Sequence, residues 1–354
     1  MARARSPFRR SPGAGCISIA IVGLAVALSA YPAAAQENSS NALPRLEAKY
    51  LQSFTGPGNL RWTLPPILEK AVTIIAGAPG PPPEETTMQE PIAVVTDTQN
   101  RLLVGDTGSL TVHVLDYGQR RYWNLNLRDS GVQSLGGIAV DSNGVIYVTS
   151  PFQGRIFTFS AKGKLLGQLQ QRKGDEASYA RPIGIAIDDA HGFIYICDRD
   201  NNLVLKLDRS GRMLQRTGAR GGGGGPGDFR RPTQIVLAGG NLFVLDSGNA
   251  RIQELDANGR FLAQFPAPDA AALAVDKWNR ILVSEPVVHR VAAYRSDGKF
   301  LGEFGGTGPD EPAFGRPAGL WIDSGHCLYV ADRNKSKVDL YEIGGESAST
   351  CLRN

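Results

Sequence analysis

The sequence predicts an all-β protein: a six-bladed β-propeller of four-stranded antiparallel blades. A short apolar run that ends in a polar residue occurs six times, and a second strand-like run starts five residues after each of these ends. The chain also contains 42 glycines, as a protein made of short strands and tight turns requires. A unit repeated six times in one register indicates a closed ring of blades.

The second strand of each blade, counted from the centre of the ring, has the strongest pattern. It is apolar, β-branched or aromatic, and in five of the six copies it ends in an acidic residue. Such a run indicates a buried strand closed by a turn. The six copies are 101–106, 145–150, 193–198, 241–246, 280–285 and 327–332.

The first and third strands follow from the same register. The third strands begin at residues 111, 155, 203, 251, 290 and 337. The first strands are 91–97, 136–141, 182–188, 232–238, 271–276 and 317–323. An apolar residue three positions before a proline precedes most of them, as in Tyr179 and Pro182. We expect this apolar side chain to pack between blades and the proline to begin a strand that needs no donor there.

The fourth strand follows a glycine turn in copies two to five, but the sixth copy lacks it. The predicted fourth strands are 163–169, 211–217, 259–265 and 298–304, with a degenerate version in 118–127. An unused strand-like segment, VTIIAG at 72–77, stands just before the first copy. We expect this N-terminal strand to complete the last blade, close the ring and remove its exposed edges.

The N-terminus has the layout of a secretory signal peptide. Arginines are followed by an apolar run at 17–30 and by small residues up to Ala35. We expect cleavage near Ala35, a secreted or periplasmic protein and no transmembrane segment afterwards, since no later apolar run is long enough to span a membrane. In chain order, the sequence predicts a signal peptide at 1–35, a partly extended leader at 36–70, the propeller at 71–345 and a C-terminal tail at 346–354.

The net charge of +4 comes from this N-terminal segment. Four of the 38 lysines and arginines lie in the first 35 residues, which contain no acid, and the remaining basic residues balance the 34 acids. The rest of the chain therefore gives no global signal for nucleic-acid binding.

Several segments resemble NHL repeats, among them NLFVLDSGNARIQELDANGRFLAQF and GGGGGPGDFRRP. The resemblance covers residues 72–343 and implies a six-bladed propeller that serves as a binding platform for protein, RNA or other partners. From it we expect a non-catalytic binding or scaffold module with a protein or glycan partner. Copies one and two depart most from the repeat, and Ser150-Pro151-Phe152 replaces the usual Asp-Ser-Gly.

The candidate binding residues lie on one rim of the ring, which we call the top face. It carries the turns between second and third strands and the links between blades. An acid at the end of the second strand and a base at the start of the third recur at fixed spacing, which indicates ion pairs that brace the turns. The same groups could form a polar surface for a ligand. These residues are Asp106, Asp198, Asp246, Glu285, Asp332, Arg155, Arg251, Arg290 and Lys337.

The alternative function is a metal-dependent lactonase-like or lyase-like enzyme acting on a small molecule in the central funnel. Six-bladed lactonases are similar in fold and hold a metal with Glu, Asn and Asp. Glu90 stands where such a glutamate would lie, but the first strands offer no matching asparagine. No cofactor is therefore predicted, and calcium is the open alternative because carboxylates on neighbouring inner strands would converge.

The histidines do not suggest the zinc site of the peptide-amidating lyases, which share this fold. His191 and His326 fall in turns on the bottom face, opposite to the top face, whereas His289 falls on the top face and His113 within a third strand. Residues so dispersed do not converge on one ion.

The glycine-rich link 216–232 is predicted to be a flexible loop on the top face. It lacks the Gly-Lys-Ser/Thr ending of a phosphate-binding loop and lies between two strands. Its arginines make it locally basic, so it could contact an anionic partner.

Three cysteines remain after signal cleavage: Cys197, Cys327 and Cys351. Cys327 begins a second strand at the bottom face, and the third strand that follows returns to the same face eight residues before Cys351. We expect a disulfide between these two in an oxidising compartment, with Cys197 left as a buried thiol. The sequence does not indicate an oligomeric state.

Overall fold

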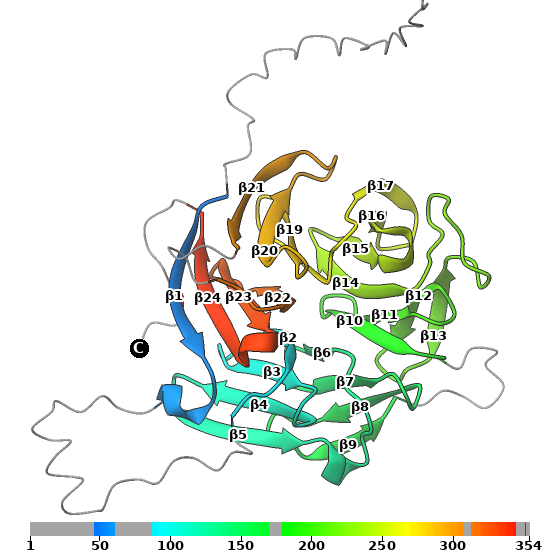
Figure 1. Ribbon diagram of the computed structural model, residues 1–354. Coiled ribbons are helices and arrows are strands. Elements are labelled where there is room, and N and C mark those ends of the chain that lie inside the picture. The colour runs from blue at the N-terminus through cyan, green and yellow to red at the C-terminus, as the bar shows by residue number, and fades with distance from the viewer. Residues whose placement is uncertain (1–45, 61–86, 170–178, 307–312, 345–350, 352–354) are drawn as a thin grey trace, which may run out of the picture. The chain divides into compact units, whose positions relative to one another are not determined.

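The computed structural model describes residues 46–60, 87–169, 179–306, 313–344 and 351. Figure 1 shows six antiparallel four-stranded sheets arranged as blades around a central axis. The first strands of neighbouring blades contact one another all the way round. The predicted six-bladed propeller is therefore confirmed. The described residues contain no helix long and apolar enough to cross a membrane.

Blades 1 to 3 each use four consecutive strands. Blade 1 contains β2 (Pro91–Thr96), β3 (Leu102–Asp106), β4 (Thr111–Asp116) and β5 (Arg121–Asn126). Blade 2 contains β6 (Ile138–Val140), β7 (Ile146–Ser150), β8 (Arg155–Phe159) and β9 (Leu165–Gln168). Blade 3 contains β10 (Pro182–Asp188), β11 (Phe193–Asp198), β12 (Leu203–Asp208) and β13 (Met213–Thr217).

Blades 4 and 5 repeat this order, and blade 6 borrows one strand. Blade 4 contains β14 (Pro232–Ala238), β15 (Asn241–Asp246), β16 (Arg251–Asp256) and β17 (Phe261–Pro266). Blade 5 contains β18 (Ala272–Val275), β19 (Ile281–Glu285), β20 (Arg290–Tyr294) and β21 (Phe300–Gly305). Blade 6 contains β22 (Pro317–Ile322), β23 (Cys327–Asp332), β24 (Lys337–Ile343) and β1 (Ala48–Phe54). Short 3-10 turns are η1 (Pro57–Leu60), η3 (Arg128–Ser130), η4 (Ser247–Asn249) and η5 (Arg333–Lys335).

Closure of the ring by an N-terminal strand is confirmed, but the residues differ from those expected. β1 pairs antiparallel with β24, from Ala48 opposite Ile343 to Phe54 opposite Val338. The prediction that residues 72–77 fill this place was wrong, because β1 occupies it; residues 72–77 themselves lie outside the described residues. Part of the segment predicted as a leader, 36–70, thus belongs to the ring. The other domain boundaries stay predictions.

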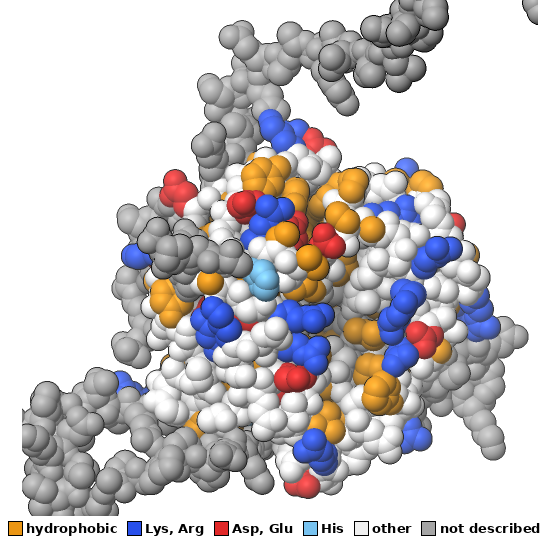
Figure 2. Space-filling view, in the orientation of Figure 1, with side chains coloured by type: hydrophobic (Ala, Val, Ile, Leu, Met, Phe, Trp, Pro, Cys, Tyr) orange, Lys and Arg blue, Asp and Glu red, His pale blue; other side chains and the backbone are white. Residues whose placement is uncertain are grey.

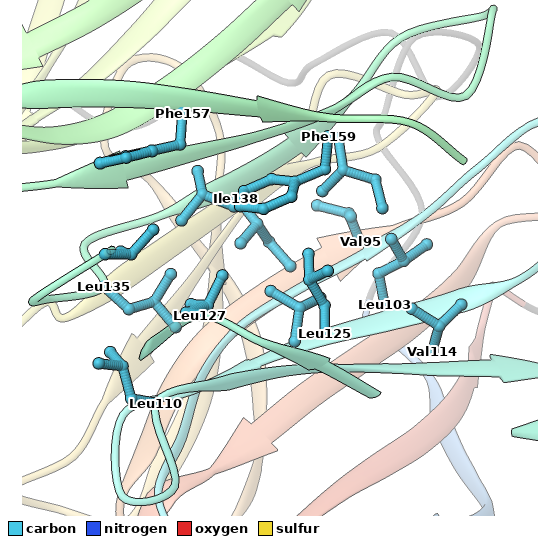
Figure 3. Packing of buried hydrophobic residues seen from close by; sticks show 14 residues of the cluster. Val95, Leu103, Leu110, Val114, Leu125, Leu127, Leu135, Ile138, Phe157 and Phe159 are labelled. Carbon is cyan, nitrogen blue, oxygen red and sulfur yellow. The ribbon is translucent and has the colours of Figure 1, made fainter. Parts of the chain in front are cut away.

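The core consists of six clusters, each between two neighbouring blades. The second strands are buried along their whole length in blades 1, 2, 5 and 6, because a neighbouring blade covers each of their faces. Figure 3 shows the cluster between blades 1 and 2, where Leu103 and Val114 of blade 1 meet Ile138 and Phe159 of blade 2. The apolar residues of the links, such as Tyr179 and Phe229, belong to these clusters as expected.

Proline and glycine fit the first strands for separate reasons. Pro182 and Pro317 begin their strands opposite Asp198 and Asp332, where proline's missing N–H costs no ladder bond. A Cβ on Gly184 would lie 2.7 Å from the Cα of Gln234, so only glycine lets β10 approach β14 this closely. The crowded centre of the ring thus selects both residue types.

Candidate functional site

The carboxylates that end the second strands are buried beneath the top face. Asp198 is fully buried, and its Oδ1 accepts hydrogen bonds from the backbone N–H groups of Ala180 at 3.1 Å and Arg181 at 2.8 Å. Asn201 donates to its Oδ2 at 2.7 Å. Asp198 therefore fixes the two residues that precede the first-strand proline.

The same arrangement recurs in three other blades. Asp332 is fully buried and accepts N–H bonds from Gly315 at 2.6 Å and Arg316 at 2.8 Å. Asp106 and Asp246, also fully buried, accept such bonds from the links before blades 1 and 4. Because a buried backbone donor must be satisfied, these acids hold the links in place.

In blade 1 a histidine replaces the expected basic partner. His113 is fully buried on β4, with Nε2 3.2 Å from Oδ2 of Asp106 and Nδ1 2.7 Å from the Tyr122 hydroxyl. Burial alone would raise the pKa of Asp106, but hydrogen bonds from His113 and the backbone of the link outweigh it and lower the pKa well below 3.8. The carboxylate is thus held ionised.

The expected acid–base pairs form in only two blades. Arg251 donates from Nε to Asp246 at 2.8 Å, and Arg290 donates from Nε to Glu285 at 2.5 Å. Lys337 instead lies 2.8 Å from Asp339 on its own strand, and the described contacts give the exposed Arg155 no ion pair. Blades 1 and 3 have Thr111 and Leu203 where the base would stand, and the second strand of blade 2 ends in Ser150 and not in an acid.

The glycine-rich link is held by Arg251. Its guanidinium donates to the carbonyl oxygens of Gly224 at 2.8 Å, Gly225 at 2.9 Å and Asp228 at 2.9 Å. Gln253 also donates to the carbonyl of Asp228, at 2.6 Å. The link lies on the top face as expected, and these bonds pin its second half instead of leaving it loose.

The remaining predicted residues take separate places. Glu90 is half exposed and forms an ion pair with Arg333 at 2.6 Å. In the part of the chain that the structure describes, no group of three or more His, Cys, Asp or Glu side chains is placed to hold a metal ion. Cys327 is joined to Cys351, with their Cα atoms 5.5 Å apart, and Cys197 is a buried free thiol.

Two top-face turns depart from the repeat and expose apolar side chains. In blade 2 Phe152 is 73% exposed, and the guanidinium of Arg181 lies 5.3 Å from the centre of its ring. In blade 5 Val287 is 69% exposed and Val288 46%. In both turns a proline follows the last residue of the second strand, whereas the other blades have polar residues there.

Arginines surround the opening of the central channel. We define the mouth as the residues directly before each first strand and directly after each second strand. Figure 2 shows basic side chains on opposite sides of a central hollow on this face. The arginines of the mouth are Arg181, Arg199, Arg231, Arg316 and Arg333.

The channel below the mouth is small and mainly apolar. A cavity of about 270 Å³ is lined by side chains such as Ile138, Ile185 and Ile235 from the first strands. Arg316 and Arg333 line it as well. The wall of the channel is therefore mainly apolar, and these two arginines of the mouth are its charged residues.

Comparisons with known proteins give a shared fold. No protein-family model and no curated protein sequence matches the chain. Among solved structures, virginiamycin B lyase from Staphylococcus aureus superposes with a TM-score of 0.53 and 13% identity, covering 75% of this chain and 87% of the lyase. At this identity the likeness shows the fold alone.

Two further similar structures come from different contexts. An auxiliary nutrient binding protein from Bacteroides thetaiotaomicron has a TM-score of 0.56 and 11% identity, covering 73% of this chain and 70% of that one. A chain from a nidogen/laminin complex has a TM-score of 0.51 and 17% identity, covering 60% of this chain and 79% of that one. One fold thus occurs in a lyase, a binding protein and a protein complex.

Sequence reasoning singled out the acids of the top turns and passed over the residues beside them. The acid recurs because it holds the backbone of the link in blades 1, 3, 4 and 6. The next residue varies from Thr107 to Arg199, Ser247 and Arg333. Comparing the copies position by position would have separated the structural residue from the surface residue.

Proposed function

We propose that this chain is an exported, non-catalytic binding module of the NHL-repeat type, and that its top face binds a protein partner. The observation that carries the proposal is the exposure of Phe152, Val287 and Val288 on that face. Interaction surfaces present apolar side chains to a partner, and aromatic residues and arginine are enriched in them.

The geometry of the acids supports a binding role over the metal-dependent alternative. Asp106, Asp198, Asp246 and Asp332 are buried and accept hydrogen bonds from the backbone. Their oxygens point into the links and are engaged there. What the top face offers to a partner is its apolar turns and its arginines.

Export is part of the proposal and rests on the sequence of residues 1–35, which lie outside the described residues. A disulfide between Cys327 and Cys351 fits an oxidising compartment. An envelope or extracellular protein is the expected partner, and a glycan is the other ligand class that the test below can return.

The test is quantitative capture from the native envelope with matched variants of the mature chain. The variant Phe152→Ser with Val287→Ser removes apolar surface from the top face. Its control, Leu166→Ser with Phe300→Ser, removes exposed apolar residues (56% and 51% exposed) from the outer strands of the same two blades, β9 and β21. We expect the top-face variant to capture at least tenfold less of one protein than the wild type does, and the control to capture the same amount as the wild type.

Other outcomes count against the proposal. If both variants lost the captured protein equally, its capture would be due to nonspecific hydrophobic binding and not to the top face. A captured glycan in place of a protein would change the ligand class. Stoichiometric metal in the purified protein that is lost in Asp198→Asn and Asp246→Asn would favour the metal-dependent enzyme.

A further inference from the structure

Two pairs of arginines stand at opposite sides of the channel mouth. In blade 3 the N–H of Arg199 donates to the carbonyl of Arg181 at 3.0 Å, and in blade 6 the N–H of Arg333 donates to the carbonyl of Arg316 at 3.0 Å. The two arginine side chains of each pair therefore start from neighbouring points of the backbone. Blades 3 and 6 lie opposite one another in a ring of six.

The fold does not require arginine at these places. In blade 1 the same backbone bond joins Thr107 to Glu90 at 3.0 Å, so neither position has an arginine. In blade 4 the residue after the acid is Ser247. Since the backbone geometry is kept without them, the paired arginines serve the surface and not the blade.

Each pair carries more positive charge than its neighbours neutralise. Arg181 lies 3.5 Å from Asp200, and Arg333 lies 2.6 Å from Glu90. Among the contacts of the described residues, Arg199 and Arg316 have no ion pair. Like charges placed side by side repel, and a funnel lined by one sign of charge concentrates ions of the other sign.

We propose that the mouth binds an acidic peptide segment of the protein partner, whose carboxylates are held by the two arginine pairs on opposite sides of the channel. Guanidinium groups bind carboxylates through two parallel hydrogen bonds, which fixes orientation as well as charge. The inference rests on the proposed function, because it names the chemistry that the partner presents to this face.

A peptide fits this surface better than a nucleic acid or another long polyanion. Glu90 and Asp200 stand among the arginines and would repel a continuous row of phosphates. Phe152, stacked against Arg181, places an apolar contact directly beside one arginine pair. An acidic peptide offers separated carboxylates together with apolar side chains, and a row of phosphates does not.

The test uses a fluorescent probe peptide, Glu-Glu-Leu-Phe-Leu-Glu-Glu, and the folded mature chain. Binding is measured by anisotropy for the wild type, for Arg199→Glu with Arg316→Glu, and for Arg212→Glu with Arg295→Glu. Arg212 and Arg295 lie in turns of the bottom face, so the control makes the same change in net charge. We expect the top-face variant to lose at least tenfold in affinity and the control to change by less than twofold.

Three results would overturn the inference: a top-face variant that binds the probe as the wild type does, a probe with glutamine for glutamate that binds equally well, or a single-stranded DNA 12-mer that competes better than the peptide. Failure here is separable from failure of the proposed function. Suppose that Arg199→Glu with Arg316→Glu still captures the envelope partner while Phe152→Ser with Val287→Ser does not. That result would support a protein partner on the top face and contradict the binding of an acidic segment by the mouth.

Discussion

The buried acid at the end of a second strand stabilises the chain that precedes the neighbouring strand. Asp198 receives two backbone N–H groups and one side-chain amide. Removing a charged acceptor leaves buried N–H donors with neither a protein partner nor water. Its loss therefore costs more stability than the hydrogen bond itself contributes. The repeated acid is therefore a structural signature of the blade.

Asp198→Asn should lower the free energy of unfolding by about 1–3 kcal/mol. The new amide NH₂ is itself a donor, so it cannot accept the hydrogen bonds that the carboxylate oxygen accepts. The matched control is Asp200→Asn, two residues away and about half exposed, which should change stability by less than about 0.5 kcal/mol. Urea unfolding followed by fluorescence measures both. Equal effects would contradict the structural role of Asp198.

Asp106 predicts a specific dependence on pH. Its pKa in the folded chain lies below its usual value of 3.8, so protonation favours the unfolded chain. The stability that it contributes is full above about pH 5 and is lost as the pH falls through the unfolded and then the folded pKa. The difference in unfolding free energy between wild type and Asp106→Asn should therefore shrink on acidification from pH 6 to pH 3. A difference that grows instead would contradict the assignment.

The cysteines predict a thiol count. Burial, with Asp246 and Asp198 nearby, raises the pKa of Cys197 well above its usual range, so its thiol stays protonated and unreactive at neutral pH. With Cys327 and Cys351 joined, the mature chain should show no reactive thiol when folded, one after unfolding and three after unfolding with reductant. Titration with a thiol reagent checks this, and three thiols without reductant would rule out the disulfide.

Among the elements, β1 decides whether the ring is closed. It joins the N-terminal part of the chain to β24, the last strand, and covers an edge that would otherwise be open. Phe54 anchors it, since it is fully buried in the cluster between blades 6 and 1 and its ring centroid lies 5.2 Å from that of Tyr117.

Phe54→Ala should destabilise the protein by about 3–5 kcal/mol, the usual cost of emptying a phenylalanine site in a core. Lys49→Ala on the same strand is the control, because the Lys49 side chain is 77% exposed and should be replaceable within about 0.5 kcal/mol. Thermal and urea unfolding measure both changes. A small effect of Phe54→Ala would mean that β1 is not needed to close the ring.

The sequence predicted the blades because each repeats a strong pattern, and it misassigned the closing strand because an outer strand has a weak one. β1 is covered on one face only, and its side chains are largely exposed or half-buried. It therefore needs few apolar residues, as the other outer strands do. VTIIAG is more apolar than that place requires, and this mismatch was the available signal.

At the scale of the whole molecule, the interior stabilises the ring, and we propose that the top face binds the partner. Six interblade clusters hold the ring together, and the constant acids of blades 1, 3, 4 and 6 fix the links from within. On the top face, Phe152, Val287 and the arginines of the mouth stand at positions that differ between blades. Function is expected where the repeat is broken, since nothing in the fold dictates those residues.

Site-specific photocrosslinking in the native envelope tests this central claim most directly. A photoreactive residue at Val287 or Phe152 samples the top face, and one at the exposed Gln99 or His191 samples turns of the bottom face. The account predicts one discrete protein adduct from both top-face positions and none from the bottom-face positions. The same adduct from the bottom-face positions, or none from either top-face position, would contradict it.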